Sequence, residues 1–193
     1  MASRTISTRI AIEGEDRFKQ SVASINSSLG ALKARLTEVK AEYANNANSM
    51  DALQAKGALL NQIQEQQRAK VDEVRLALEN AKKAQQGYAA QVTAAKEDVA
   101  RAEAALSALR SSADSSAEAE EKLAASLASA QEELARSEQY NEAAQRGVNN
   151  WQRQLSSAET ALAKTNKGIE AILSGLLRWP SHRWLRRWGR SSP

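Results

Sequence analysis

The chain has no cysteine, so it cannot hold a disulfide bond, a thiolate zinc site or a cysteine nucleophile. Among its 193 residues are only 2 prolines, 8 glycines and 4% aromatic residues. A compact globular domain of this length normally needs more large apolar side chains to fill its core. No apolar run could span a membrane as a helix, and no secretory signal follows Met1. The residues that dominate are Ala, Glu, Gln, Lys, Arg, Leu and Ser, which is the composition of long helices.

Candidates for catalysis or metal binding are few. His182 is the only histidine, and a catalytic triad or a histidine metal site needs an imidazole held by partners. No glycine-rich phosphate loop and no paired-carboxylate pocket can be identified. The sequence therefore predicts no enzymatic activity, no cofactor and no metal site. The acidic residues that we expect on a solvated helix face are Glu118, Glu120, Glu121, Glu132 and Glu133.

Apolar residues recur in one heptad phase from Ile25 to Leu176. Two series, starting at Ile25 and at Leu29, advance in steps of seven, and we call their positions the heptad stripe. A hydrophobic repeat of 3.5 residues held over this length is typical of coiled coils. It predicts an all-α fold, self-association through helices and a mechanical or interaction role. The stripe residues expected to make the contacts are Ile25, Leu29, Leu32, Leu36, Val39, Tyr43, Leu53, Leu60, Val71, Val74, Leu78, Val92, Val99, Leu106, Leu109, Leu123, Leu127, Leu134, Val148, Trp151, Leu155, Leu162, Ile169 and Ile172.

Polar residues interrupt the heptad stripe, and alanine at many other positions makes the expected interface thin. Buried polar groups can fix register and oligomeric state, or they can mark stretches where the stripe is not buried. Their number favours the second interpretation, loose or transient packing. Trp151 is large for an alanine-rich interface, and we expect it to be a packing anchor. The polar stripe residues are Asn46, Gln64, Gln67, Gln85, Glu120 and Asn141.

The chain divides into three segments. Residues 1–14 place β-branched residues at period two, which predicts a short N-terminal β-strand. Residues 15–176 form the heptad-repeat helical region, with breaks near residues 45–49 and 111–116, where Asn and Ser cluster. Residues 177–193 are basic and rich in Trp and Arg, and we expect this tail to be disordered.

The two polar breaks leave two architectures open. Helices are predicted over about residues 17–43, 50–110 and 117–171, with Ser115 and Glu118 at capping-box spacing. Because the heptad phase crosses both breaks unchanged, the helices can form a long coiled-coil rod with soft spots. They can also form a folded-back helical hairpin, with the breaks as turns, although the unbroken phase favours the rod.

The net charge of +4 is concentrated in the tail. Residues 177–193 hold five arginines and no acid, and subtracting these five from 27 basic residues leaves 22 against 23 acidic ones. Interleaved Arg and Trp can bind nucleic acid or an anionic membrane surface. The abrupt change of composition after about residue 173 is also what out-of-frame translation of a GC-rich gene gives, and we expect that origin. The tail residues that could make contacts are Trp179, Arg183, Trp184, Arg186, Arg187 and Trp188.

Three local stretches carry a resemblance to a known family. They are residues 6–19, ISTRIAIEGEDRFK, residues 43–53, YANNANSMDAL, and residues 148–155, VNNWQRQL, followed by SAETAL at 157–162. In this order they resemble the N-terminal region of phage tail tape measure proteins from siphophages and prophages of Gram-positive bacteria. The resemblance covers about residues 5–172.

The resemblance implies a structural protein of virion assembly, without catalytic residues, whose helical length sets the length of the tail tube. It implies tail tube protein and tail assembly chaperones as partners, and a location in the bacterial host cytoplasm and then in the lumen of the virion tail. Family members are usually many hundreds of residues long, so this chain is expected to be truncated or frameshifted. The alternatives are a coiled-coil adaptor or filament protein, and a peripheral membrane or nucleic-acid binder acting through the Trp/Arg tail.

Overall fold

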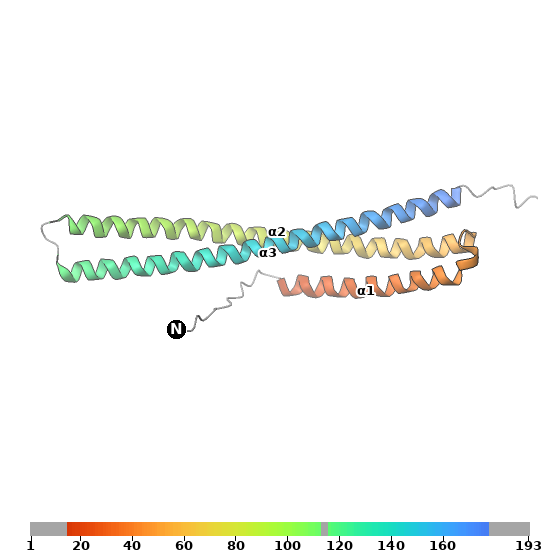
Figure 1. Ribbon diagram of the computed structural model, residues 1–193, viewed down its shortest axis with the longest axis horizontal. Helices are drawn as coiled ribbons and strands as arrows, with labels where there is room; N and C mark the ends of the chain where they lie inside the picture. The colour runs from red at the N-terminus through yellow and green to blue at the C-terminus, as the bar shows by residue number, and fades with distance from the viewer. Residues whose placement is uncertain (1–14, 113–115, 178–193) are drawn as a thin grey trace, which may run out of the picture. The chain divides into compact units, whose positions relative to one another are not determined.

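The computed structural model describes residues 15–112 and 116–177, and these contain helices and no strand (Figure 1). The all-α fold class is therefore confirmed, whereas the expected strand within residues 1–14 lies outside the described residues. Three α-helices, rather than one continuous helix, make up the heptad-repeat region. The elements in chain order are α1 (Glu15–Glu42), the 3-10 helix η1 (Ala44–Asn46), α2 (Met50–Arg110) and α3 (Ala117–Leu177).

The stretch Tyr43–Ser49, which we call the hinge, separates α1 from α2. Ser49 caps α2, because its Oγ accepts a hydrogen bond from the Ala52 amide at 3.2 Å. A second hydrogen bond joins α2 to the hinge: Lys56 Nζ donates to the Ala47 carbonyl at 2.9 Å. Backbone hydrogen bonds continue through the hinge, from the Asn46 amide to the Tyr43 carbonyl at 3.0 Å and from the Ser49 amide to the Asn46 carbonyl at 2.9 Å, without a glycine or a proline.

Ser116 caps α3, since its Oγ accepts a hydrogen bond from the Ala119 amide at 3.2 Å. We expected the cap at Ser115, paired with Glu118, but Ser115 lies outside the described residues. The observed cap follows from where the helix begins: with Ala117 as the first helical residue, Ser116 is the residue whose hydroxyl reaches the amide three positions on.

The third helix extends beyond its expected end. We predicted that it would end near Ala171, shortly before the composition changes near Ser174, but α3 continues to Leu177. Ile172 and Leu176 keep the heptad phase through this extra stretch, and Gly175 is tolerated within it. The described part of α3 therefore continues past the change in composition and keeps the heptad phase.

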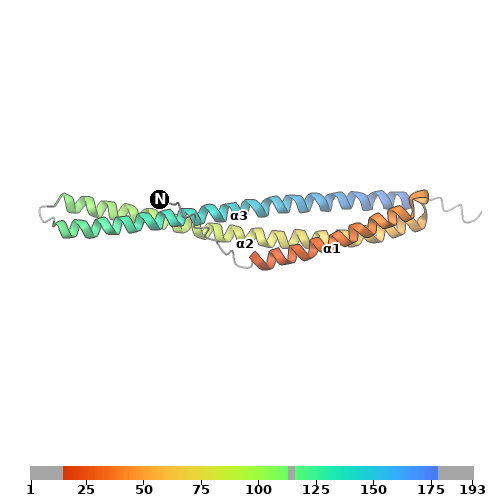
Figure 2. The same ribbon diagram turned by 60° about the horizontal axis from the view of Figure 1, so that its bottom comes forward.

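The helices contribute to two compact units, which we describe separately. Unit 1 comprises Val74–Gln154 together with Met1–Phe18, of which residues 15–18 are described. Within it the second part of α2 and the first part of α3 lie side by side and antiparallel (Figures 1 and 2). Its buried residues lie mainly on the facing sides of these two helices; they are Phe18, Val74, Ala77, Leu78, Ala81, Ala95, Leu106, Ser137, Ala144 and Trp151.

Unit 2 comprises Lys19–Glu73 and Leu155–Pro193, described as far as Leu177. Here α1 and the last part of α3 both accompany the first part of α2, so the core has three helices (Figure 1). The third helix allows α2 to bury residues on two neighbouring sides. The buried residues of unit 2 are Val22, Leu29, Ala52, Leu53, Leu59, Ile63, Gln67, Val71, Ala158 and Thr165.

Candidate helix-pairing site

The heptad stripe is the surface through which the helices meet. Every stripe residue named from the sequence as a contact is buried or half-buried, and none is exposed. Trp151, expected to be a packing anchor, is 2% exposed and belongs to unit 1. The buried members of that set are Leu29, Leu53, Val71, Val74, Leu78, Leu106 and Trp151.

In unit 1, two contacts fix how α2 faces α3. The rings of Tyr88 and Tyr140 lie 5.9 Å apart between centroids, tilted by 53°, a favourable geometry for an aromatic pair. One turn away, Gln85 Nε2 donates a hydrogen bond to Asn141 Oδ1 at 3.1 Å. Residue numbers rise along α2 as they fall along α3, which is the antiparallel register.

Two interhelical ion pairs follow the same antiparallel register toward the turn between α2 and α3. Lys96 Nζ lies 3.7 Å from Glu138 Oε1, and Arg110 Nε lies 3.8 Å from Glu120 Oε2. The side chains of Lys96, Glu138 and Arg110 are at least half exposed and that of Glu120 is 38% exposed, so each pair adds little stability. Their arrangement nevertheless shows the two helices aligned up to the turn.

In unit 2, glycines lie at the contact between α2 and α3. A β-carbon placed on Gly168 would lie 3.6 Å from Leu60 Cδ1, and one on Gly57 would lie 3.7 Å from Ile172 Cγ2. Each glycine thus sits beneath a large side chain of the opposite helix. Between these contacts and the hinge, the same relation holds for Gly175, 3.7 Å from Leu53 Cδ1.

The polar stripe residues fall into different environments. Gln64 Nε2 donates to Asn166 Oδ1 at 2.8 Å in unit 2, which parallels the Gln85–Asn141 pair of unit 1. Gln67 is 4% exposed, and its Oε1 has no hydrogen-bond partner. Asn46 is exposed within the hinge. Polar groups in the stripe are therefore both paired and unpaired, so neither interpretation offered from the sequence covers all of them.

Several buried residues were not predicted from the sequence. Phe18 and Val22 lie in the same heptad phase one repeat before Ile25, so extending the count by seven residues would have found them. Leu59 and Ile63 lie one position beside the stripe. They are buried because unit 2 has a third helix, and the heptad phase alone carries no sign of that helix.

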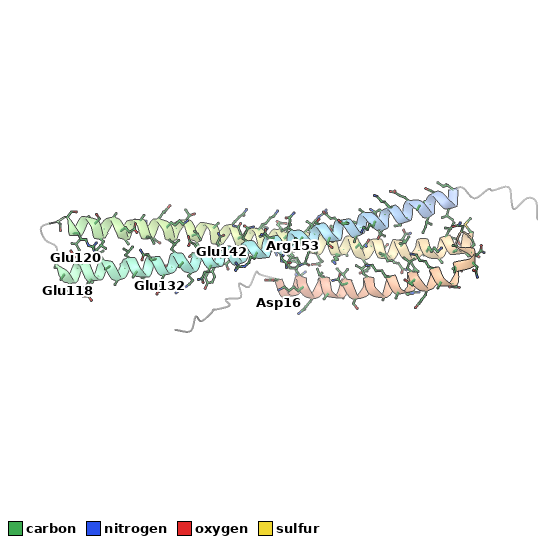
Figure 3. The ribbon with its side chains drawn as sticks, in the orientation of Figure 1. Asp16, Glu118, Glu120, Glu132, Glu142 and Arg153 are labelled. Atoms are coloured by element: carbon green, nitrogen blue, oxygen red, sulfur yellow. The ribbon has the colours of Figure 1, made fainter. Side chains whose placement is uncertain are left out.

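Charged residues lie on the outer sides of the helices. The labelled acids Glu132 and Glu142 on α3 are exposed (Figure 3), as are three of the other acids expected on a solvated face: Glu118, Glu121 and Glu133. Within α2, a hydrogen bond from Lys83 to Glu79, at 2.9 Å, lowers the pKa of the Glu79 carboxyl. These one-turn pairs stabilise individual helices.

A groove of about 450 Å³ lies at the hinge end of unit 2. Its walls are mostly apolar, and Lys56 is its charged residue. The small side chains at this end leave the space open, since neither glycine nor alanine fills it. The lining residues are Ala47, Asn48, Leu53, Lys56, Ala171, Ile172 and Gly175.

Other kinds of site were searched for in the described residues. No group of three or more His, Asp or Glu side chains there could hold a metal ion, and no helix there is both long and apolar enough to cross a membrane. His182 and the Trp/Arg tail residues Trp179, Arg183, Trp184, Arg186, Arg187 and Trp188 lie outside the described part of the chain. Comparison with protein-family models, with curated protein sequences and with solved structures found no match to this chain.

Proposed function

We propose that this chain is a structural protein whose helices pair as antiparallel coiled coils through the heptad stripe. The observation that supports this most directly is that no predicted contact residue of the stripe is exposed. Large charged faces on the outer sides of α2 and α3 complete the pattern of helices that pair along one side. The role that follows is to span a distance and to present helix surfaces to partners.

The specific role we propose is that of a phage tail protein similar to the N-terminal region of a tape measure. Its support is the resemblance of three ordered stretches of sequence. One of these, residues 43–53, forms the hinge and the start of α2, and another, residues 148–155, contains the buried Trp151. The stretches that carry the resemblance therefore lie at a turn and at a core position of the fold.

The proposed mechanism is geometric. An α-helix rises by about 1.5 Å per residue, so a heptad corresponds to about 10 Å. A protein that lies along a growing tube converts its number of heptads into a length, and tail tube subunits or assembly chaperones would bind its exposed helix surfaces. No covalent step is required of any residue.

The test is a set of heptad deletions and insertions in a phage whose tape measure carries this region. Removing or adding whole heptads between Val71 and Leu109 should shorten or lengthen the tail by about 10 Å each, measured by electron microscopy of purified virions. Substituting charged surface residues over the same stretch, at constant length, is the matched control. Tails of unchanged length after deletion would contradict the measuring role.

The second candidate is a coiled-coil adaptor or filament protein. The thin, alanine-rich stripe and the exposed Leu173 and Leu177, 53% and 87% exposed, favour a protein that binds other helices reversibly. Mass spectrometry of purified virions separates the two candidates. A tail component is recovered with the virion, whereas an adaptor stays in the lysate.

A further inference from the structure

We infer that α1 is exchanged between two copies of this chain, through straightening of the hinge Tyr43–Ser49 so that α1 and α2 become one continuous helix. The partner is thus a second copy, and the contact is the α1-binding surface of unit 2. The inference does not depend on a role in a phage tail, because it concerns only unit 2 and its hinge.

The first observation is the heptad phase across the hinge. The stripe runs through α1 to Tyr43 and resumes at Met50 and Leu53 without a change of phase. Two helices joined by a turn need no common phase, because the turn redirects the chain and any rotation of the second helix can be accommodated. One straight helix does need it, since only then do both halves of the stripe lie on the same side. The heptad phase therefore permits α1 and α2 to join as one straight helix with the stripe on one side.

The second observation is the backbone of the hinge, which is already close to helical. Ala47 has φ −59° and ψ −19°, and Tyr43 has φ −98° and ψ 22°. The Asn46 amide donates to the Tyr43 carbonyl at 3.0 Å, and the Ser49 amide to the Asn46 carbonyl at 2.9 Å, both three residues back. With neither glycine nor proline in the hinge, modest rotations convert this tight helical path into an α-helix.

The third step is that a second copy can supply the contacts that α1 makes within unit 2. In unit 2, α1 runs antiparallel to α2, with Asn26 Oδ1 accepting a hydrogen bond from Lys70 Nζ at 2.8 Å. Val22 and Leu29 of α1 are buried, and Leu59 of α2 is buried as well. Two straightened copies related by a twofold axis at the hinge would place each α1 on the other copy in this same orientation. Exchange then changes the backbone conformation of the hinge alone, and the contacts of α1 in unit 2 form between two chains instead of within one.

Asparagines hold the hinge in its bent form. Asn45, Asn46 and Asn48 are exposed, and asparagine is a poor helix former that favours turns. Straightening requires all three to enter a helix interior in both copies. Their helix propensity therefore sets the balance between the single chain and the exchanged pair.

The promoting variant replaces these three residues: Asn45→Ala, Asn46→Ala and Asn48→Ala. Six asparagines per dimer become alanine, so the dimer dissociation constant should fall on the order of a hundredfold. Size-exclusion chromatography with light scattering over a range of concentrations measures it. The matched control is the triple variant Asn61→Ala, Asn149→Ala and Asn150→Ala, at exposed sites inside α2 and α3, which should leave the dissociation constant within a few-fold of the natural chain.

The blocking variant is Ala47→Pro. The φ of Ala47 already suits proline, and Ala47 is not a donor in the described hinge hydrogen bonds, so the bent form is retained. A proline at this position of a continuous helix would remove a backbone bond and clash with the preceding turn. We expect a monomer at every concentration, with a helical circular dichroism spectrum like that of the natural chain.

Crosslinking separates exchange from simple association. Because the chain has no cysteine, Asn26→Cys and Lys70→Cys introduce the only thiols, and a short bis-maleimide can join them. In the promoting variant the crosslink should join two chains, which a denaturing gel shows as a covalent dimer. In Ala47→Pro it should stay within one chain. A promoting variant that remains monomeric, a dimer crosslinked only within chains, or dimers of Ala47→Pro would each overturn the inference.

Discussion

Gln67, like Glu73, carries a buried side-chain oxygen without a hydrogen-bond partner in the described part of unit 2. Its side chain is 4% exposed, and its Oε1 accepts no hydrogen bond. A buried acceptor without a partner costs about 1–3 kcal/mol. We therefore predict that Gln67→Leu, which keeps the size of the side chain, raises the free energy of unfolding by about 1 kcal/mol or more. Urea denaturation followed by circular dichroism measures this change.

The control for Gln67 is the same substitution about one turn away. Gln64→Leu removes the donor to Asn166, so the Asn166 side chain loses its partner. We expect Gln64→Leu to lower the unfolding free energy by about 1 kcal/mol. If both substitutions shifted stability in the same direction, hydrogen bonding would not be what distinguishes these two positions.

Gly168 tests whether the close approach of α2 and α3 in unit 2 requires glycine. A β-carbon there would meet Leu60 Cδ1 at 3.6 Å, an ordinary van der Waals distance. Gly168→Ala should therefore stabilise the protein by about 1 kcal/mol, because alanine favours the helix and loses less entropy on folding. Gly87→Ala is the control, since nothing lies within 4 Å of its β-carbon position. A loss of stability at Gly168 but not at Gly87 would mean that the helices cannot tolerate the methyl group.

At the scale of the helices, the Gln85–Asn141 pair is predicted to select the register of α2 against α3 in unit 1. Asn141→Leu leaves Gln85 without its partner and should lower the unfolding free energy by about 1 kcal/mol. The double variant Gln85→Leu and Asn141→Leu should be at least as stable as the natural chain, because no polar group is left unpaired. A double-mutant cycle from urea denaturation gives the coupling energy. Additive effects of the two substitutions would contradict a role for the pair.

The helices themselves follow closely from the sequence, for identifiable reasons. Ser49 and the hinge asparagines interrupt a long run of strong helix formers, so the start of α2 at Met50 was predictable. The end of α3 was not, because the sequence changes character near Ser174 while Leu176 still keeps the heptad phase. At this point the composition predicts that the helix ends, whereas the heptad periodicity predicts that it continues. The helix α3 does continue, to Leu177.

The pairing of helices was less predictable than their existence. The heptad phase identified Gln85 and Asn141 as polar stripe residues, but it could not show that they meet, because that depends on which direction the chain takes after the turn. Leu59 and Ile63 were missed for a related reason. They contribute to a second buried side of α2, and a single stripe predicts only one.

At the scale of the whole chain, the fold depends on one repeated contact more than on any single residue. The stripe is rich in alanine, and the interhelical ion pairs Lys96–Glu138 and Arg110–Glu120 are exposed, so each heptad contributes modestly. Stability then accumulates repeat by repeat, as in other proteins built from stacked units. We therefore expect stability to depend more on keeping the heptad phase than on keeping the length of the helices.

Matched deletions in unit 1 test this dependence on phase. Removing residues 99–105 from α2 and 124–130 from α3 deletes one heptad from each helix and keeps every remaining stripe residue on its side. Removing only residues 99–103 and 126–130 deletes less but rotates the ends of both helices by about 140° at 3.6 residues per turn. Leu106 and Leu109 then turn away from α3, so the five-residue variant should be less stable than the seven-residue variant by roughly 3 kcal/mol, despite being longer. Thermal unfolding followed by circular dichroism compares them, and equal stability would show that phase is not what holds the helices together.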